Sequence, residues 1–168
     1  MNALDTDRRS ESLAAWQRAL AFVVAIAVTF AMAGVGAMNL PGPWYAQLQK
    51  PALTPPDWVF GPVWTLLYLL MGVAAGMVWQ KVGLRQARVA LGLYLVQLVL
   101  NAAWSGLFFG LHRPGWALVD IALLWLAIVA TIAAFSRISV AAAWLLAPYL
   151  AWVSFASYLN FMLWRLNA

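Results

Sequence analysis

One stretch of the chain places aromatic and amide side chains on a single face of a predicted helix. Its members, Tyr94, Gln97, Asn101, Trp104 and Phe108, are spaced 3, 4, 3 and 4 residues apart. At about 100° per residue, this spacing confines the five side chains to an arc of about 80°. Aromatic rings beside hydrogen-bonding amides could line a pocket for a ligand.

Two further stretches repeat this pattern at helical spacing. They consist of Tyr149, Trp152, Ala156 and Asn160 in one case, and of Phe60, Trp64, Tyr68, Met71 and Ala75 in the other. Amides in membrane helices also join helices to one another, and Trp and Tyr gather at membrane interfaces. Pattern alone therefore leaves two interpretations open, a ligand pocket with three aromatic walls or helix packing.

Other residue types restrict the chemistry further. The chain has no cysteine and a single histidine, His112, which excludes disulfides, thiolate metal sites and multi-histidine metal sites. No Ser-His-Asp set, paired carboxylates or metal cluster supports ordinary hydrolytic or redox catalysis. We therefore expect no metal and no required cofactor.

Asp120 is the only acidic residue inside a predicted membrane span. A carboxylate at that depth must be neutral, paired or hydrated. Its position, about one turn into its helix, brings it within reach of water or of a loop cation such as Arg113. Two roles stay open for it, structural pairing and a part in ligand binding or proton transfer.

The composition is that of an integral membrane protein. The chain is 65% hydrophobic and 9% charged, whereas a soluble domain is roughly 45–50% apolar and about 25% charged. The net charge of +5 comes from basic residues that lie between apolar runs. They are interpreted as topology signals and contacts to anionic lipid headgroups, so the expected partner is the bilayer and not nucleic acid.

Five apolar runs reach the length of about 20 residues that a membrane-spanning helix needs. They cover residues 19–38, 58–79, 89–111, 116–135 and 140–164. The fold class predicted is an all-α integral membrane bundle of five transmembrane helices in one domain, residues 16–168. Residues 1–15 form a polar N-terminal tail. The longest connection, residues 39–57, holds five of the eight prolines.

The distribution of basic residues predicts the orientation. Seven of the ten lie on the N-terminal side of the spans: Arg8, Arg9, Arg18, Lys81, Arg85, Arg88 and Arg137. The positive-inside rule then places the N-terminus in the cytoplasm, and the C-terminus and the proline-rich loop on the far side. We expect a bacterial cell membrane, and leave open a bacterial or mitochondrial outer membrane.

Two local motifs predict how helices begin and pack. Thr54 and Asp57 fit an N-cap and a capping box at the start of the second span. The pairs Gly72 with Gly76 and Gly106 with Gly110 each form a GxxxG motif, which is typical of close helix packing and of dimer faces.

Four stretches together resemble the translocator protein family, TspO/MBR, whose members are also called tryptophan-rich sensory proteins or peripheral benzodiazepine receptors. They are WYAQLQKPALTPPDWVFGPVWTLLY (44–68), QLVLNAAWSGLFFG (97–110), GWALVD (115–120) and PYLAWVSFASYLNFMLWRLN (148–167). The resemblance covers residues 20–167 in order and at family spacing.

The resemblance implies five transmembrane helices, commonly paired in a homodimer, with a pocket beneath the first loop. That pocket binds porphyrins such as protoporphyrin IX, synthetic isoquinoline and benzodiazepine ligands and, in animals, cholesterol. By motif position, the pocket residues implied are Trp64, Tyr68, Gln97, Asn101, Trp152 and Ala156, to which the stripes add Trp104 and Tyr149. The lid over the pocket would contain Trp44, Lys50, Pro51 and Trp58.

This chain departs from the family pattern at two places. Ala52 and Leu53 follow Lys50-Pro51 where family members often carry aromatics, which weakens the loop's contribution to a porphyrin lid. The vertebrate cholesterol motif has a tyrosine shortly before an arginine, and no tyrosine stands close enough before Arg165. This argues against sterol binding.

Three functions remain open at this point. The first is a receptor or translocator for tetrapyrroles, in transport, sensing or regulation. The second is a light- and oxygen-dependent enzyme that degrades porphyrin with Trp64 and Trp152 as electron donors. The third is a structural membrane subunit, in which the aromatic stripes serve packing alone.

Overall fold

Helices form nearly all of the chain in this computed structural model, which describes residues 3–168, with side chains described for Trp16 and from Arg18 onward. In order, the α-helices are α1 (Ala3–Ala37), α2 (Pro43–Gln47), α3 (Phe60–Ser105), α4 (Pro114–Ser136), α5 (Val140–Leu145) and α6 (Ala147–Leu166). A 3-10 turn, η1 (Asp57–Val59), precedes α3, and a π-helix, η2 (Gly106–Gly110), follows it. Residues 3–168 contain no strand, so the all-α prediction is confirmed.

Four helical segments are long and apolar enough to cross a membrane. They are Arg18–Ala37, Asp57–Gly110, Pro114–Ser136 and Val140–Leu166. The second combines two of the predicted spans. A straight helix with the 46 residues of α3 would be about 69 Å long, more than twice a hydrocarbon core of about 30 Å.

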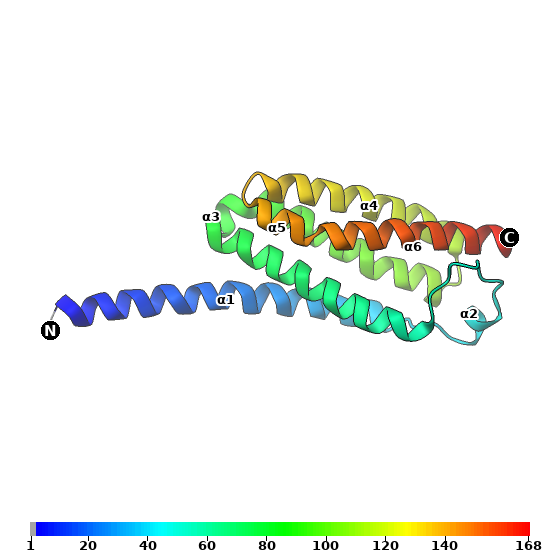
Figure 1. The fold of residues 1–168 in the computed structure, drawn as a ribbon, viewed down its shortest axis with the longest axis horizontal. Coiled ribbons are helices and arrows are strands. Elements are labelled where there is room, and N and C mark those ends of the chain that lie inside the picture. Colours follow the sequence, from blue (N-terminus) through cyan, green and yellow to red (C-terminus); the bar gives the residue numbers. More distant parts are fainter. Residues whose placement is uncertain (1–2) are drawn as a thin grey trace.

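Gly83 divides α3 into two arms. Its backbone has φ 74° and ψ 163°, which is not helical. Only glycine adopts such a positive φ without a steric cost, because it lacks a Cβ. Figure 1 shows that the chain reverses there and that the second arm of α3 returns along the bundle. The predicted connection between spans two and three is therefore a tight turn.

The last predicted span is likewise divided. Helix α5 ends at Leu145, and α6 begins at Ala147 with Pro148 in its first turn. A proline has no backbone N–H to donate, so it suits the start of a helix and interrupts its interior. Ser139 caps α5, where its Oγ accepts a hydrogen bond from the Ala142 backbone N–H at 3.3 Å.

The polar segment predicted as a tail is helical from Ala3 onward. Residues 1 and 2 lie outside the described residues. Figure 1 shows the first turns of α1 projecting past the end of the bundle at which α3 reverses. The opposite end carries α2 and the C-terminus.

The N-cap predicted at Thr54 is wrong. Residue Pro56 is the N-cap of η1, and it makes no side-chain capping bond. The Thr54 hydroxyl instead donates to the Pro51 carbonyl at 2.8 Å, and the Thr54 backbone N–H donates to the same oxygen at 3.0 Å. Thr54 therefore closes a turn within the loop, because Pro55 and Pro56 hold the chain extended before the helix begins.

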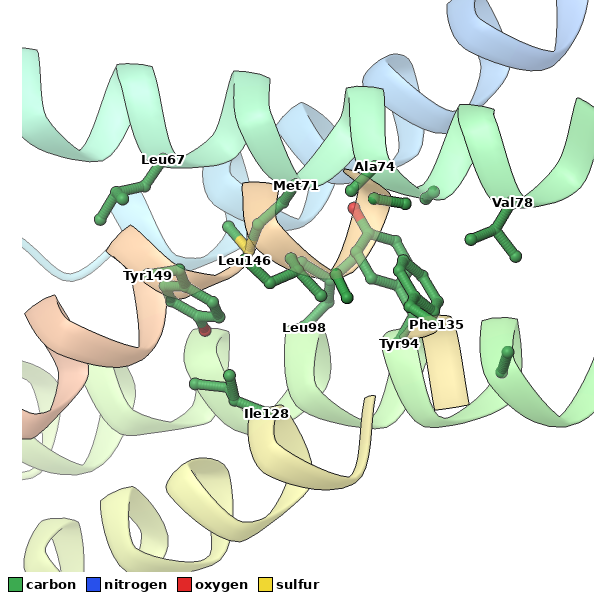
Figure 2. Close-up of a cluster of buried hydrophobic side chains, with 14 of the residues drawn as sticks. Leu67, Met71, Ala74, Val78, Tyr94, Leu98, Ile128, Phe135, Leu146 and Tyr149 are labelled. Carbon is green, nitrogen blue, oxygen red and sulfur yellow. The ribbon is translucent and has the colours of Figure 1, made fainter. Parts of the chain in front are cut away.

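The core lies between the two arms of α3 and the helices α4, α5 and α6. Figure 2 shows Met71 and Leu67 from the first arm facing Leu98 and Tyr94 from the second, with Tyr149 of α6 among them. The Tyr94 and Phe135 rings stack with their centroids 6.0 Å apart. These buried rings and aliphatic side chains fix the arms relative to one another.

Helix α1 packs against the first arm of α3 through the Gly72–Gly76 motif. A Cβ at Gly72 would lie 2.8 Å from the Ile26 Cα, and one at Gly76 would lie 2.6 Å from the Phe22 Cδ1. This confirms close helix packing as the use of that motif. At Gly110, the close neighbour is the Asn39 side chain, whose Oδ1 would overlap an added Cβ.

Candidate ligand-binding site

A cavity of about 580 Å³ lies at the end of the bundle that carries α2. Its volume is within the range of small-molecule pockets, roughly 300–1,000 Å³. Its lining comes from the end of α1 and the loop after it, both arms of α3, the π-helix, α4 and α6. The lining residues are Ala33, Gly36, Ala37, Asn39, Leu40, Pro41, Tyr45, Asp57, Phe60, Gly61, Trp64, Tyr68, Asn101, Trp104, Ser105, Phe109, Ile121, Leu124, Trp152, Val153 and Ala156.

Three predicted aromatic stripes meet at this cavity. Six of the eight residues predicted as ligand contacts line it: Trp64, Tyr68, Asn101, Trp104, Trp152 and Ala156. The other two, Gln97 and Tyr149, are buried behind the wall, with 1% and 0% of their surfaces exposed. The helical period therefore brings side chains from α3 and α6 to one place, with a second layer behind them.

A hydrogen-bonded chain of side chains crosses one wall of the cavity. The Tyr68 hydroxyl donates to Asn101 Oδ1 at 2.6 Å, and Asn101 Nδ2 donates to the Tyr149 hydroxyl at 3.1 Å. These two hydrogen bonds join both arms of α3 to α6. Hydrogen bonds to both its oxygen and its nitrogen therefore fix the orientation of the Asn101 amide group.

We expect Asn101→Ala to destabilise the protein by about 1–2 kcal/mol, because the buried Tyr149 hydroxyl loses its amide partner. Thermal unfolding of the purified protein in detergent measures the change. Ser157→Ala is the control, since the Ser157 hydroxyl donates only within its own helix, to the Val153 carbonyl at 2.7 Å. Equal thermal unfolding midpoints for the two variants would show that the hydrogen bonds of Asn101 do not stabilise the fold.

A second amide supports Trp104. The Trp104 indole N–H donates to Asn160 Oδ1 at 2.9 Å, and Asn160 Nδ2 donates to the Pro114 carbonyl at 2.9 Å. This arrangement holds the Trp104 ring at the cavity wall and ties α6 to the start of α4. The Trp104 indole N–H is therefore already engaged within the protein and is not free to donate to a ligand.

The aromatic walls are built from packed rings. Trp64 stacks on Tyr68, with centroids 5.3 Å apart and planes 27° apart. Trp152 meets Phe60 edge to face at 5.9 Å. Both tryptophans line the cavity while their neighbours restrict the orientation of each ring.

The π-helix η2 turns two consecutive phenylalanines toward the protein interior. Phe108 is 1% exposed and stacks on Trp104 at 5.1 Å, while Phe109 lines the cavity and meets Trp104 edge to face at 5.6 Å. A regular helix would rotate neighbouring side chains by about 100°. The wider π turn explains why the sequence pattern, which assumes a regular helix, did not predict Phe109 as a lining residue.

The loop after α1 is fastened to the bundle at two places. The Trp44 ring stacks on the His112 ring at 4.3 Å, with an angle of 20° between the planes. The backbone N–H of Gln49 donates to Asn167 Oδ1 at 2.9 Å, and Asn167 Nδ2 donates back to the Gln49 carbonyl at 3.0 Å. These contacts join the loop to the segment before α4 and to the C-terminal end of α6.

Tyr45, in the short helix α2 of this loop, contacts the π-helix and lines the cavity. It is buried, meets Phe109 edge to face at 5.4 Å and lines the cavity. The Lys50 Nζ lies 4.6 Å from the centroid of the Tyr45 ring. Burial raises the pKa of the Tyr45 hydroxyl, and the negative charge of Asp57 raises this pKa further.

The four predicted lid residues occupy different positions in this loop. Neither Trp44 nor Lys50 lines the cavity. Trp44 stacks on the His112 ring, and Lys50 lies over the Tyr45 ring. Pro51 is buried and accepts the two Thr54 hydrogen bonds. Trp58 is 75% exposed and faces away from the protein interior.

Sequence reasoning did not assign Asn39, Tyr45 or Asp57 to the cavity wall. All three lie in the connection between α1 and η1 or at its end. The helical elements of this connection, α2 and η1, have only five and three residues, too few for a period from which the direction of a side chain can be predicted. The only available signal was their position in the connection 39–57, which contains most of the residues predicted as the lid.

Asp120 lies in α4 beside the cavity and does not line it. It is 8% exposed, and its Oδ2 atom has no hydrogen-bond partner among the described residues. Structural pairing through that oxygen, with Arg113 or another cation, is therefore not what the structure shows. The Gln97 Oε1 atom is also buried without a partner, while Gln97 Nε2 lies 3.9 Å from the Met71 sulfur.

These observations define the class of protein: a helical membrane protein with an aromatic, ligand-sized cavity at one end of its bundle. The family model described as the TspO/MBR family matches residues 19–165. The chain belongs to this family, and it is an integral membrane protein.

Several relatives are similar over most of the chain. The tryptophan-rich protein TspO of Chlorobaculum tepidum is 46% identical over 153 residues, which are 88% of this chain and 95% of that protein. The translocator protein of Homo sapiens is 51% identical over 126 residues, 74% of this chain and 75% of that protein. The tryptophan-rich sensory protein of Cereibacter sphaeroides is 42% identical over 146 residues, 87% of this chain and 90% of that protein.

Proposed function

We propose that this protein is a membrane receptor or translocator that binds tetrapyrroles, with protoporphyrin IX as the representative ligand, and related hydrophobic molecules. The observation that carries this proposal is the meeting of three aromatic stripes at one cavity of about 580 Å³. If the stripes served packing alone, as in a purely structural subunit, their rings would fill the space between the helices. The open cavity supports ligand binding instead.

The cavity has the chemistry that a metal-free porphyrin needs. A large flat ring can pack against Trp64 and Trp152, and each aromatic pair adds roughly 0.5–1.5 kcal/mol beyond the burial of apolar surface. The lining residues of the described chain include no histidine, cysteine or methionine. The wall therefore lacks the histidine, cysteine and methionine side chains that most often ligate a haem iron, which favours the metal-free ring.

The proposal includes the way in which the chain crosses the membrane. The two arms of α3, separated by the reversal at Gly83, would each cross once, which gives five crossings in total. The excess of basic residues near the N-terminal end supports a cytoplasmic N-terminus. The cavity would then open on the far side, toward the loop with α2. A homodimer in a bacterial cell membrane remains part of the proposal.

A titration of protoporphyrin IX into the purified protein tests the function. Tryptophan fluorescence should be quenched in a saturable way, with one porphyrin bound per chain, because several of the 11 tryptophans lie at or near the cavity. An unrelated helical membrane protein of similar tryptophan content, in the same detergent, controls for porphyrin dissolved in micelles. Quenching that does not saturate, or that equals the control, would contradict the proposal.

A further inference from the structure

Asp57 is the only charged residue among those that line the cavity in the described part of the chain. It opens the 3-10 turn η1, and its side chain is exposed to water. The N-terminal end of a helix carries a partial positive charge that stabilises a carboxylate there. A ligand group that lies at this part of the cavity therefore meets a fixed negative charge.

Three polar residues of the cavity wall, Tyr68, Asn101 and Trp104, are already engaged in hydrogen bonds within the protein. The Asn101 amide is engaged by Tyr68 on one side and by Tyr149 on the other. The Trp104 N–H donates to Asn160. A charged ligand group placed among them would lose its hydration without gaining a free partner. We therefore expect the charged end of a ligand to lie toward the water-exposed side, where Asp57 is.

Lys50, a candidate for a compensating cation, does not line the cavity. Lys50 lies over the Tyr45 ring, 4.6 Å from its centroid. The Asp57 charge acts on the Tyr45 hydroxyl and contributes to the raised pKa of that group. The Asp57 charge therefore acts on a second lining residue, Tyr45, even with Lys50 over the Tyr45 ring.

We propose that Asp57 selects ligands by charge: it favours hydrophobic ligands whose outward-facing group is neutral or cationic, and it weakens the binding of ligands with carboxylates at that position. The inference rests on the proposed function, because it concerns the same cavity. Among the hydrophobic ligands of the proposed function, it ranks flat molecules with a neutral or basic edge above the same molecules with free carboxylates at that edge.

The test compares protoporphyrin IX with its dimethyl ester, which has the same ring without free carboxylates. Both are titrated into the unmodified protein and into Asp57→Asn in one detergent, and the ratio of the two dissociation constants, acid over ester, is determined for each protein. Partition of each porphyrin into micelles cancels when the two ratios are compared. We expect the ratio to fall about three- to tenfold in Asp57→Asn, as for one partly screened charge.

Two variants separate charge from shape. Asp57→Glu keeps the charge and should keep the ratio of the unmodified protein. Glu11→Gln removes one negative charge from the early part of α1, far along the helix from the cavity, and should also keep it. Equal ratios in Asp57→Asn and the unmodified protein, with both porphyrins bound, would overturn this inference alone. If the unmodified protein bound neither porphyrin saturably, the proposed function would fail, and this inference with it.

Discussion

Replacing both Trp64 and Trp152 with phenylalanine is expected to weaken protoporphyrin IX binding about 10- to 50-fold. Each indole offers a larger flat surface than a phenyl ring, and a loss of roughly 1 kcal/mol at each position multiplies to this range. Both tryptophans line the cavity from different helices, α3 and α6. The dissociation constant is measured by fluorescence titration, and the quenching at a fixed porphyrin concentration should fall with it.

The matched control replaces two tryptophans that lie outside the cavity. Trp116 and Trp144 are 67% and 72% exposed, and neither lines the cavity. The Trp116→Phe and Trp144→Phe double variant removes the same number of indoles and should bind with the affinity of the unmodified protein. Unchanged affinity in the Trp64 and Trp152 variant, or an equal loss in both variants, would show that the porphyrin binds elsewhere.

Helical periodicity is the reason that much of this site could be predicted from the sequence. In a regular helix, residues three and four apart share a face, so Asn101 and Trp104 were placed together, as were Trp152 and Ala156. Their common cavity confirms that each stripe faces inward. Long apolar runs likewise predicted helices long enough to cross a membrane, because that length is set by the thickness of the bilayer, and four such helical segments are present in the described chain.

What the sequence could not show depends on departures from regular helices and on contacts between distant segments. The π turn that directs Phe109 to the cavity has no simple periodic pattern. The attachment of the loop through Gln49 and Asn167 joins residues 118 positions apart. Thr54 had a plausible capping pattern, but its hydroxyl bonds within the loop instead. These features are determined by tertiary packing and not by the local conformational preferences of the sequence.

The cavity and the loop that covers this end of the bundle share a connected set of rings. Tyr45 contacts Phe109, and Phe109 contacts Trp104, each edge to face. All three residues line the cavity. A ligand that packed against Trp104 or Phe109 would therefore touch the same cluster of rings that contacts the loop.

Gly72→Ala is expected to destabilise the protein by about 1–3 kcal/mol, because it adds a methyl group where α1 and α3 are in close contact. The new Cβ would lie 2.8 Å from the Ile26 Cα and 3.3 Å from its backbone nitrogen, so a change of side-chain rotamer cannot relieve the overlap. Helix α1 would have to move away. Thermal unfolding in detergent should show a midpoint lower by roughly 3–10 °C.

Gly34→Ala provides the matched control within α1. It adds the same methyl group at a position where no atom lies within 4 Å of the new Cβ. Alanine is intrinsically better than glycine in a helix by about 1 kcal/mol, so this variant should be as stable as the unmodified protein or more stable. The same gain acts at Gly72, and only the contact with Ile26 opposes it there. If the two variants unfolded at the same temperature, the close packing of α1 on α3 would not be a source of stability.

Movement of α1 in Gly72→Ala should also reduce ligand affinity. Ala33, Gly36 and Ala37, in the last turns of α1, form part of the cavity wall. A displaced α1 would separate this wall from Trp64 and Tyr68 on the first arm of α3, and a ligand between them would lose contacts on one side. Protoporphyrin IX should therefore bind more weakly to Gly72→Ala than to Gly34→Ala at a temperature where both are folded. Equal affinities would mean that the wall formed by α1 does not contact the bound ligand.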